Sequence, residues 1–202
     1  MKIMGIDLAG KEENPTGICI WYLNKVNKVK INLFTVYSDD EILEIVNSFQ
    51  PTIIVFDAPL SLPKGRCCLE KNCECAVGGH FRQSEREIRR YGPVLPLTFK
   101  GMKMLTMRGV GLAGVLSDKY QLMETHPRTV QKILGFRNLK KSLEKYFQIP
   151  QNPSEHELDG ILAVLSGYFY ANDCFNELGD VNEGTIILPK GRDCLNSLDS
   201  IQ

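Results

Sequence analysis

A single carboxylate interrupts the otherwise apolar segment near the N-terminus. The stretch from Lys2 to Leu8 has the composition of a short buried strand, and Asp7 stands within it. An ionised Asp in such a strand costs several kcal/mol unless a metal ion or a cationic partner compensates it. The chain must therefore fold so that Asp7 is either a satisfied structural residue or the first ligand of an active site.

Four further strands are indicated by β-branched and aromatic runs between turn signals. Segments Ile18 to Leu23 and Val29 to Tyr37 follow the first strand through short turns, which predicts an antiparallel meander. Thr52 to Phe56 is fully apolar, as in strands covered on both faces, and Asp57 follows it. The fifth strand, Tyr120 to Glu124, also ends on a carboxylate. Three of the five predicted strands therefore carry an acidic residue at or near their ends.

Capping and periodicity signals predict the helices. Asp39 can cap one that ends before Pro51, and Thr125 or His126 can cap another that ends at Gly135. The expected ranges are 40–50, 84–91, 127–135, 139–147 and 155–172. The last begins with a capping box, Ser154-Glu-His-Glu157. In that helix Asp159 stands on the flank of the apolar face, and the following glycine permits close approach to a neighbour.

The order of these elements predicts one α/β domain over residues 1–190. Its core is a mixed five-stranded sheet, a three-strand antiparallel meander plus parallel strands, flanked by helices. A long insertion, 60–117, follows the fourth strand; a late strand is expected over 185–188, and a fraying C-terminal tail over 191–202. A chain of 202 residues is long enough for one such core.

The location is predicted to be cytoplasmic. No apolar run approaches the roughly 20 residues that a membrane-spanning helix needs, so no membrane contact is expected. The N-terminus also lacks the charged and long apolar regions of a signal peptide. The sequence leaves the oligomeric state open, and a homodimer is compatible with it.

The acidic residues at the strand ends are expected to meet. If strands one, four and five lie side by side, Asp7, Asp57 and Glu124 gather at one sheet edge, and the last long helix adds Asp159. Such a cluster raises the pKa of its own members unless cations are present. Oxygen-rich sites suit Mg²⁺ or Mn²⁺, and one or two such ions can support phosphodiester hydrolysis. The four residues are therefore the candidate metal ligands and catalytic residues of a nuclease.

Six short motifs give the chain a resemblance to a known family. It resembles domain of unknown function family 429, whose members are predicted nucleases of ribonuclease H-like fold, over most of its length. The resemblance implies that fold and a metal-dependent nuclease activity. The motifs that carry it are Gly5-Ile-Asp-Leu-Ala-Gly10, Asp57-Ala-Pro-Leu60, Ser84-Glu-Arg-Glu-Ile-Arg89, Gly101-Met102, Glu124-Thr-His-Pro-Arg128 with Leu134-Gly135, and His156-Glu-Leu-Asp159.

Three residues in these motifs have alternative roles that the sequence leaves open. Glu124 is either a ligand or a partner of the N-terminus of the next helix. His126 is a helix cap, or it relays protons or binds phosphate beside Arg128, and it is counted among the candidate catalytic residues. His156 orients a metal-bound water or is simply exposed to solvent.

The insertion carries an excess of positive charge, although the chain as a whole has none. Residues 64–108 hold 10 Lys or Arg against 4 Asp or Glu, which predicts contact with the phosphate backbone of DNA or RNA. The alternative is a helix whose charges pair internally. The candidate nucleic-acid-binding residues are Arg82, Arg86, Arg89, Arg90, Lys100, Lys103, Arg108 and Arg128.

A group of cysteines in the insertion has ligand types that suit zinc. Its spacing is irregular, so reduced thiols packed in a loop are the alternative. Seven cysteines, an odd number, predict mostly free thiols or metal ligands rather than a disulfide scaffold. The candidate zinc ligands are Cys67, Cys68, Cys73, Cys75 and His80.

Two other functions are compatible with the same residues. A glycine-bearing hairpin after the first strand is also typical of phosphotransferases with the actin-like or sugar-kinase fold, although 202 residues do not provide their two large lobes. A non-catalytic nucleic-acid-binding module would keep the same fold and the same acidic residues.

Overall fold

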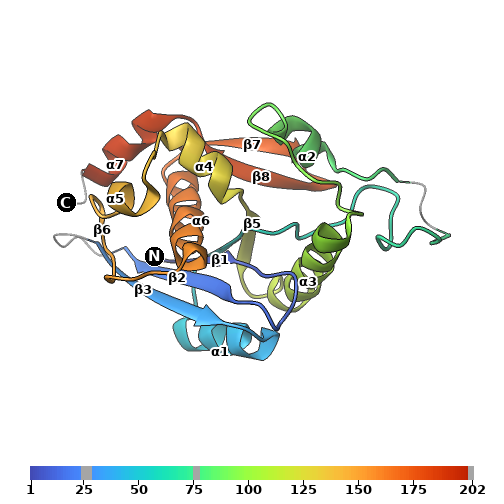
Figure 1. The fold of residues 1–202 in the computed structure, drawn as a ribbon, viewed down its shortest axis with the longest axis horizontal. Coiled ribbons are helices and arrows are strands. Elements are labelled where there is room, and N and C mark those ends of the chain that lie inside the picture. The colour runs from blue at the N-terminus through green and yellow to red at the C-terminus, as the bar shows by residue number, and fades with distance from the viewer. Residues whose placement is uncertain (24–28, 75–77, 200–202) are drawn as a thin grey trace.

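The structure is a computed structural model that describes residues 1–23, 29–74 and 78–199. One mixed sheet of eight strands forms its centre, in the order β6-β3-β2-β1-β4-β5-β8-β7 (Figure 1). The strands are β1 (Lys2–Asp7), β2 (Thr16–Tyr22), β3 (Val29–Val36), β4 (Ile53–Phe56), β5 (Gln121–Glu124), β6 (Phe147–Gln148), β7 (Phe175–Asp180) and β8 (Gly184–Pro189). The helices are α1 (Asp39–Phe49), α2 (Gln83–Ile88), α3 (Lys100–Leu116), α4 (Pro127–Leu134), α5 (Leu139–Leu143), α6 (Glu155–Ala171), the 3-10 helix η1 (Arg192–Leu195) and α7 (Asn196–Asp199).

The five predicted strands form the middle of this sheet with the predicted pairing. Strands β1, β2 and β3 are antiparallel neighbours, and β4 and β5 follow β1 in parallel. The sheet is larger than predicted because β6 adds to one edge and the β7–β8 hairpin adds to the other. Strand β8 contains the expected late strand. Strand β7 was not predicted because Leu178 is its one buried apolar side chain, so its sequence shows no strand pattern.

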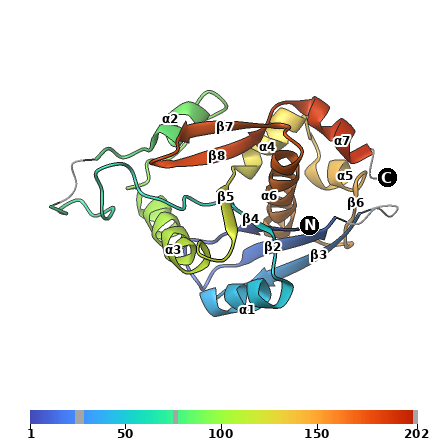
Figure 2. The ribbon, with the colours of Figure 1, turned by 180° about the vertical axis from the view of Figure 1, so that it is seen from behind.

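Both faces of the central strands are buried, as their apolar sequences require. Alternate residues point to two cores, so Ile3 and Val55 pack beneath α6, whereas Met4 and Ile54 pack beneath α1. Helices α1 and α6 lie on opposite sides of β2 and β3 (Figures 1 and 2). The side chains at the carboxyl ends of β1, β4 and β5 therefore sit at an edge of a rigid, doubly covered sheet.

Helix caps agree with their sequence signals in most cases. Ser154 and Glu157 form the predicted capping box of α6, His126 caps α4, and Gly135 ends α4 with a φ of 71°. Helix α1 differs slightly, because Ser38 rather than Asp39 is its cap.

The long insertion is more regular than its sequence suggests. Its glycine-rich run forms the 17-residue helix α3. Gly109 explains part of this, because a side chain at that position would overlap the carbonyl oxygen of Pro59. Close packing therefore requires glycine at this position. Because glycine has a low helix propensity, the sequence did not predict the helix.

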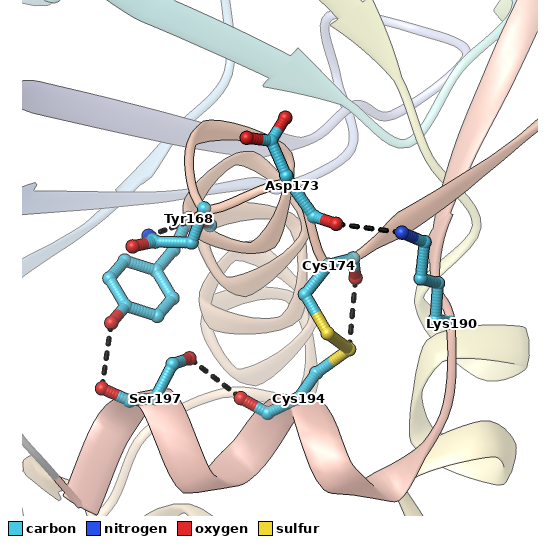
Figure 3. The surroundings of a disulfide bond; sticks show 7 residues. Tyr168, Asp173, Cys174, Lys190, Cys194 and Ser197 are labelled. Atoms are coloured by element: carbon cyan, nitrogen blue, oxygen red, sulfur yellow. Dashed lines mark hydrogen bonds between the residues drawn. A yellow bond between two sulfur atoms is a disulfide. The ribbon is translucent and has the colours of Figure 1, made fainter.

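A disulfide closes the C-terminal part of the chain. Cys174 and Cys194 are bonded to each other, and the Tyr168 hydroxyl donates to the carbonyl of Ser197 nearby (Figure 3). Cys67 also takes part in a disulfide. The prediction of mostly free thiols is therefore wrong for these residues. Disulfides persist in oxidising compartments, and the cytoplasmic location stays a prediction.

The C-terminal segment packs rather than frays over 192–199. It forms η1 and α7, and Leu195 and Leu198 bury their side chains in the core. The division into a domain at 1–190 and a tail at 191–202 stays a prediction. Among the described residues, no helix combines the length and apolarity needed to cross a membrane.

Helix α6 rests directly on the backbone of β1 and β2. A side chain at Gly5 would overlap the carbonyl oxygen of Gly160, and one at Gly17 would overlap the carbonyl of His156. Gly160 lies in turn against Cys19. The sequence indicated close approach at Gly160, and the structure shows that β1 and β2 supply matching glycines.

We expect Gly5→Ala to destabilise the protein by about 2 to 3 kcal/mol or more, because its Cβ would meet backbone atoms of α6 that cannot move independently. Urea unfolding measures the change. Gly111→Ala is the matched control: it lies within α3 with open space around its Cβ position, so it should stabilise by up to about 1 kcal/mol. Equal effects of the two substitutions would contradict the close approach.

Candidate active site

Three carboxylates converge where β1, β4 and α6 meet. Asp7 ends β1, Asp57 directly follows β4, and Asp159 stands in the second turn of α6. The parallel pairing of β1 with β4 brings the first two to the same sheet edge, and the Asp57 N–H donates to the carbonyl of Ile6 at 2.8 Å. The glycine contacts described above hold α6 close enough to add the third. This is the convergence that the sequence predicted.

The charge of Asp7 acts on the other two carboxylates. Burial raises the pKa of Asp57 well above its usual range, and the charges of Asp7 and Asp159 raise it further. Burial, followed by the charge of Asp7, raises the pKa of Asp159 to about 6. The Arg128 guanidinium opposes both shifts. The site therefore has a deficit of positive charge.

His156 lies against Asp7 from the first turn of α6. Its Nδ1 is 2.6 Å from Asp7 Oδ2, and 45% of its side chain remains exposed. Burial raises the pKa of Asp7, whereas the hydrogen bond and charge of His156 lower it. With Asp7 ionised, the His156 Nδ1–H donates this hydrogen bond, and Nε2 is the ring nitrogen that remains for other contacts.

His126 is held as the cap of α4. The Thr129 N–H donates to His126 Nδ1 at 3.3 Å. Burial, followed by the charge of Arg128, lowers the pKa of His126. The ring is therefore neutral at pH 7, with its proton on Nε2. A catalytic role for His126 stays a prediction.

Glu124, which the sequence indicated as a metal ligand, is bound to an arginine. Its Oε1 and Oε2 each accept from Arg82 at 2.7 Å, and Oε1 also accepts from the Leu60 N–H at 2.8 Å. Arg82 is fully buried and also pairs with Glu85. Burial opposes its charge, but the hydrogen bonds and charges of Glu124 and then Glu85 outweigh that effect and raise the pKa of Arg82. Glu124 thus has a cationic partner within the protein.

The eight predicted nucleic-acid-binding residues divide into two buried arginines, one paired lysine and five exposed residues. Arg82 and Arg108 are buried and serve the fold; Arg108 binds Asp39 Oδ1 at 2.7 Å and the carbonyls of Ala9 and Tyr37. For these two the prediction is wrong, because their charges are used internally. Lys103 pairs with Glu70 at 2.8 Å. The exposed members are Arg86, Arg89, Arg90, Lys100 and Arg128.

The cysteine group is brought together only in part. The Sγ atoms of Cys67, Cys68 and Cys73 lie within 4.8 Å of one another, and among the described residues this is the one trio of metal-ligating types that meets that spacing. His80 instead contacts Thr98 Oγ1 at 2.8 Å, and Cys75 lies outside the described residues. Because Cys67 is in a disulfide, a zinc site stays a prediction that requires the reduced protein.

Comparisons with known proteins agree on the fold. No family model matches the chain, and no curated protein matches it, so nothing in those comparisons supports family 429 itself. Two solved structures of RuvC from Thermus thermophilus are similar, each at 13% identity over 86% of this chain and 96% of the other. The TM-score is 0.53 for RuvC in complex with a Holliday junction substrate and 0.50 for RuvC alone. The chain has the ribonuclease H-like fold, as predicted.

Arg82→Ala should destabilise the protein by about 3 to 5 kcal/mol, because it leaves Glu124 and Glu85 buried without their cation. Arg86→Ala is the control on the same helix; its side chain is exposed, and we expect a change within about 0.5 kcal/mol. Denaturant unfolding compares them. A small effect at Arg82 would show that Glu124 is not held by this ion pair.

A second prediction concerns pH. Because the folded protein raises the pKa of Asp159 to about 6, from about 4 in the unfolded chain, ionisation of Asp159 opposes folding. The penalty is absent below about pH 4, grows as pH rises to about 6, and is complete above it. Asp159→Asn should therefore stabilise the metal-free protein at pH 7.5 by about 1 to 2 kcal/mol, allowing for solvent screening, and have little effect at pH 4.

Urea unfolding in EDTA at the two pH values measures this difference. Asp118→Asn, at an exposed position after α3, is the control and should leave stability unchanged at both. Loss of stability in Asp159→Asn at pH 7.5 would contradict the repulsion among the three carboxylates.

Proposed function

We propose that this chain is a divalent-metal-dependent nuclease, in which Asp7, Asp57 and Asp159 hold one or two Mg²⁺ or Mn²⁺ ions. One observation carries the proposal: acidic side chains at β1, β4 and α6 meet at one sheet edge, close enough that the charge of Asp7 raises the pKa of both Asp57 and Asp159. In a purely structural role, a buried carboxylate is normally paired with a cation of the protein, as Glu124 is with Arg82. Asp7 bonds to His156, but within the described residues neither Asp57 nor Asp159 makes an ion pair, which leaves acidic oxygens for a cation.

The donor set suits these ions. Three carboxylates provide hard oxygen ligands, which favour Mg²⁺ or Mn²⁺ over softer metals. Their ligand atoms do not all lie within 4.8 Å of one another, so one ion held by all three would require the side chains to move closer together. When bound, such ions supply activation of water and charge stabilisation for the leaving oxygen.

The neighbouring residues have roles that follow from their contacts. Hydrogen bonding to Asp7 fixes the ring of His156 and presents Nε2 as a proton acceptor. Arg128, exposed beside the carboxylates, can bind the phosphate of the substrate. The neutral His126 can donate from Nε2 but cannot bind phosphate as a cation.

Nucleic acid is the proposed partner. The similarity to RuvC, one of whose structures holds a Holliday junction, supports this choice, as do the exposed basic residues Arg86, Arg89 and Arg90 on and after α2. A phosphotransferase is less well supported. The β1–β2 turn is closed by a hydrogen bond from the Ala9 N–H to Thr16 Oγ1 at 3.1 Å, so this part of the hairpin is already occupied by an internal contact.

The test is Mg²⁺- or Mn²⁺-dependent cleavage of single-stranded, duplex, hybrid and branched nucleic acids. We expect Asp7→Asn to lower the rate by at least about 100-fold, because one metal ligand and the partner of His156 are lost. Glu155→Gln is the control, because Glu155 is exposed at the start of the same helix. It should retain nearly full activity.

The same proteins distinguish the non-catalytic alternative. A binding module would show no turnover with any metal, and its nucleic-acid affinity would not change with chelator or with Asp7→Asn. Cleavage that persists unchanged in Asp7→Asn would contradict the proposed site itself.

A further inference from the structure

A cavity of about 320 Å³ reaches one of the three carboxylates, Asp57. Asp57 and Arg128 belong to its lining, so it shares an edge with the proposed metal site. Most of its wall is apolar and comes from the insertion, α3 and β8. The apolar side chains that enclose it include Pro59, Val94, Leu95, Met102, Leu105 and Ile186.

Leu95 lines this cavity and is exposed, although the backbone of its segment is restrained. Leu95 is 53% exposed, yet Leu97, two residues later, is fully buried and its N–H donates to the carbonyl of His80 at 2.9 Å. Pro93 and Pro96 restrict the backbone on either side. Among the exposed large apolar side chains of the described residues, Leu95 is the one that lines the cavity, so it offers an apolar contact to a ligand there.

Two basic side chains, Arg128 and Lys132, lie along the continuation of this cavity. A second cavity of about 190 Å³ shares Pro93, Val94 and Arg128 with the first, and it adds Lys132. Lys132 is fixed there by a 2.6 Å hydrogen bond from Nζ to the carbonyl of Tyr91. A ligand that fits these features has a flat or apolar group in the cavity and an anionic backbone that contacts Arg128 and Lys132.

We propose that the first cavity receives a nucleobase that is out of the base stack, so that the substrate is unpaired nucleic acid, either single-stranded or at a branch. This inference rests on the proposed nuclease function. A nucleotide whose phosphate lies at Asp57 can place its base against Met102 and Leu105. A base within a continuous duplex cannot enter, because it stays stacked on its neighbours. The cavity volume lies at the lower end of the range for small-molecule sites.

Fluorescence anisotropy with the Asp7→Asn protein and Mg²⁺ tests the inference without cleavage. The probes are a labelled single strand, the same strand in a continuous duplex, and the same strand with a central run of abasic sites. We expect the base-bearing single strand to bind about 10-fold more tightly than the other two. Equal affinity for base-bearing and abasic strands, a preference for the duplex, or no binding would overturn the proposal.

Cavity variants provide the second readout. Met102→Ala and Leu95→Ala should weaken binding of the base-bearing strand about 3- to 10-fold and leave the abasic strand unchanged. Met107→Ala and Val115→Ala are matched controls, because these residues are exposed on α3 and do not line the cavity. The proposal fails if the control variants weaken binding as much as the cavity variants.

Failure of the nuclease proposal is seen separately. Mg²⁺-dependent cleavage by the wild-type protein tests that function, whereas discrimination between base-bearing and abasic strands tests the cavity. A protein that cleaves duplex and abasic strands as fast as normal single strands would retain the first proposal and overturn the second.

Discussion

The contact between the backbones of α6 and the β1–β2 hairpin determines where the chemistry can occur. Gly17 pairs with Asp7 across the two strands, and a side chain there would overlap the carbonyl of His156. Gly5 and Gly160 allow the same approach further along the helix. If these positions carried side chains, α6 would rise from the sheet and carry His156 and Asp159 away from Asp7. The site therefore depends on three positions that have no side chain.

Two buried carboxylates at neighbouring strand ends, Glu124 and Asp57, have different surroundings. Glu124 is paired with Arg82, which also binds Glu85 and the Ser61 hydroxyl and so joins β5 to the insertion and α2. Asp57, at the end of the neighbouring strand, makes no ion pair within the described residues. Burial and the charges of Asp7 and Asp159 raise its pKa, whereas at Glu124 the hydrogen bond and charge of Arg82 oppose the effect of burial. The contrast between two adjacent strand ends separates a structural ion pair from a candidate ligand. For this reason the proposed metal site comprises three carboxylates, although the sequence indicated four.

The fold could be predicted largely from local signals. Apolar strands, the Ser154–Glu157 capping box and Gly135 depend on neighbouring residues, so the sequence shows them directly. Helix α3 was missed because its glycines serve tertiary packing, as at Gly109, which local propensity does not register. The roles of Arg82 and Arg108 were missed for a similar reason. Their partners lie 42 and 69 residues away in sequence, and an Arg in an internal ion pair looks the same in sequence as one that binds phosphate.

The central claim is that Asp7, Asp57 and Asp159 form a cation site. A crystal structure of the protein soaked in Mn²⁺, with anomalous scattering measured to locate the ions, tests it most directly. We expect one or two anomalous peaks coordinated by these three side chains, with Glu124 still bound to Arg82. Peaks coordinated by Glu124 with Arg82 displaced, or no peak at the three carboxylates at saturating Mn²⁺, would contradict it.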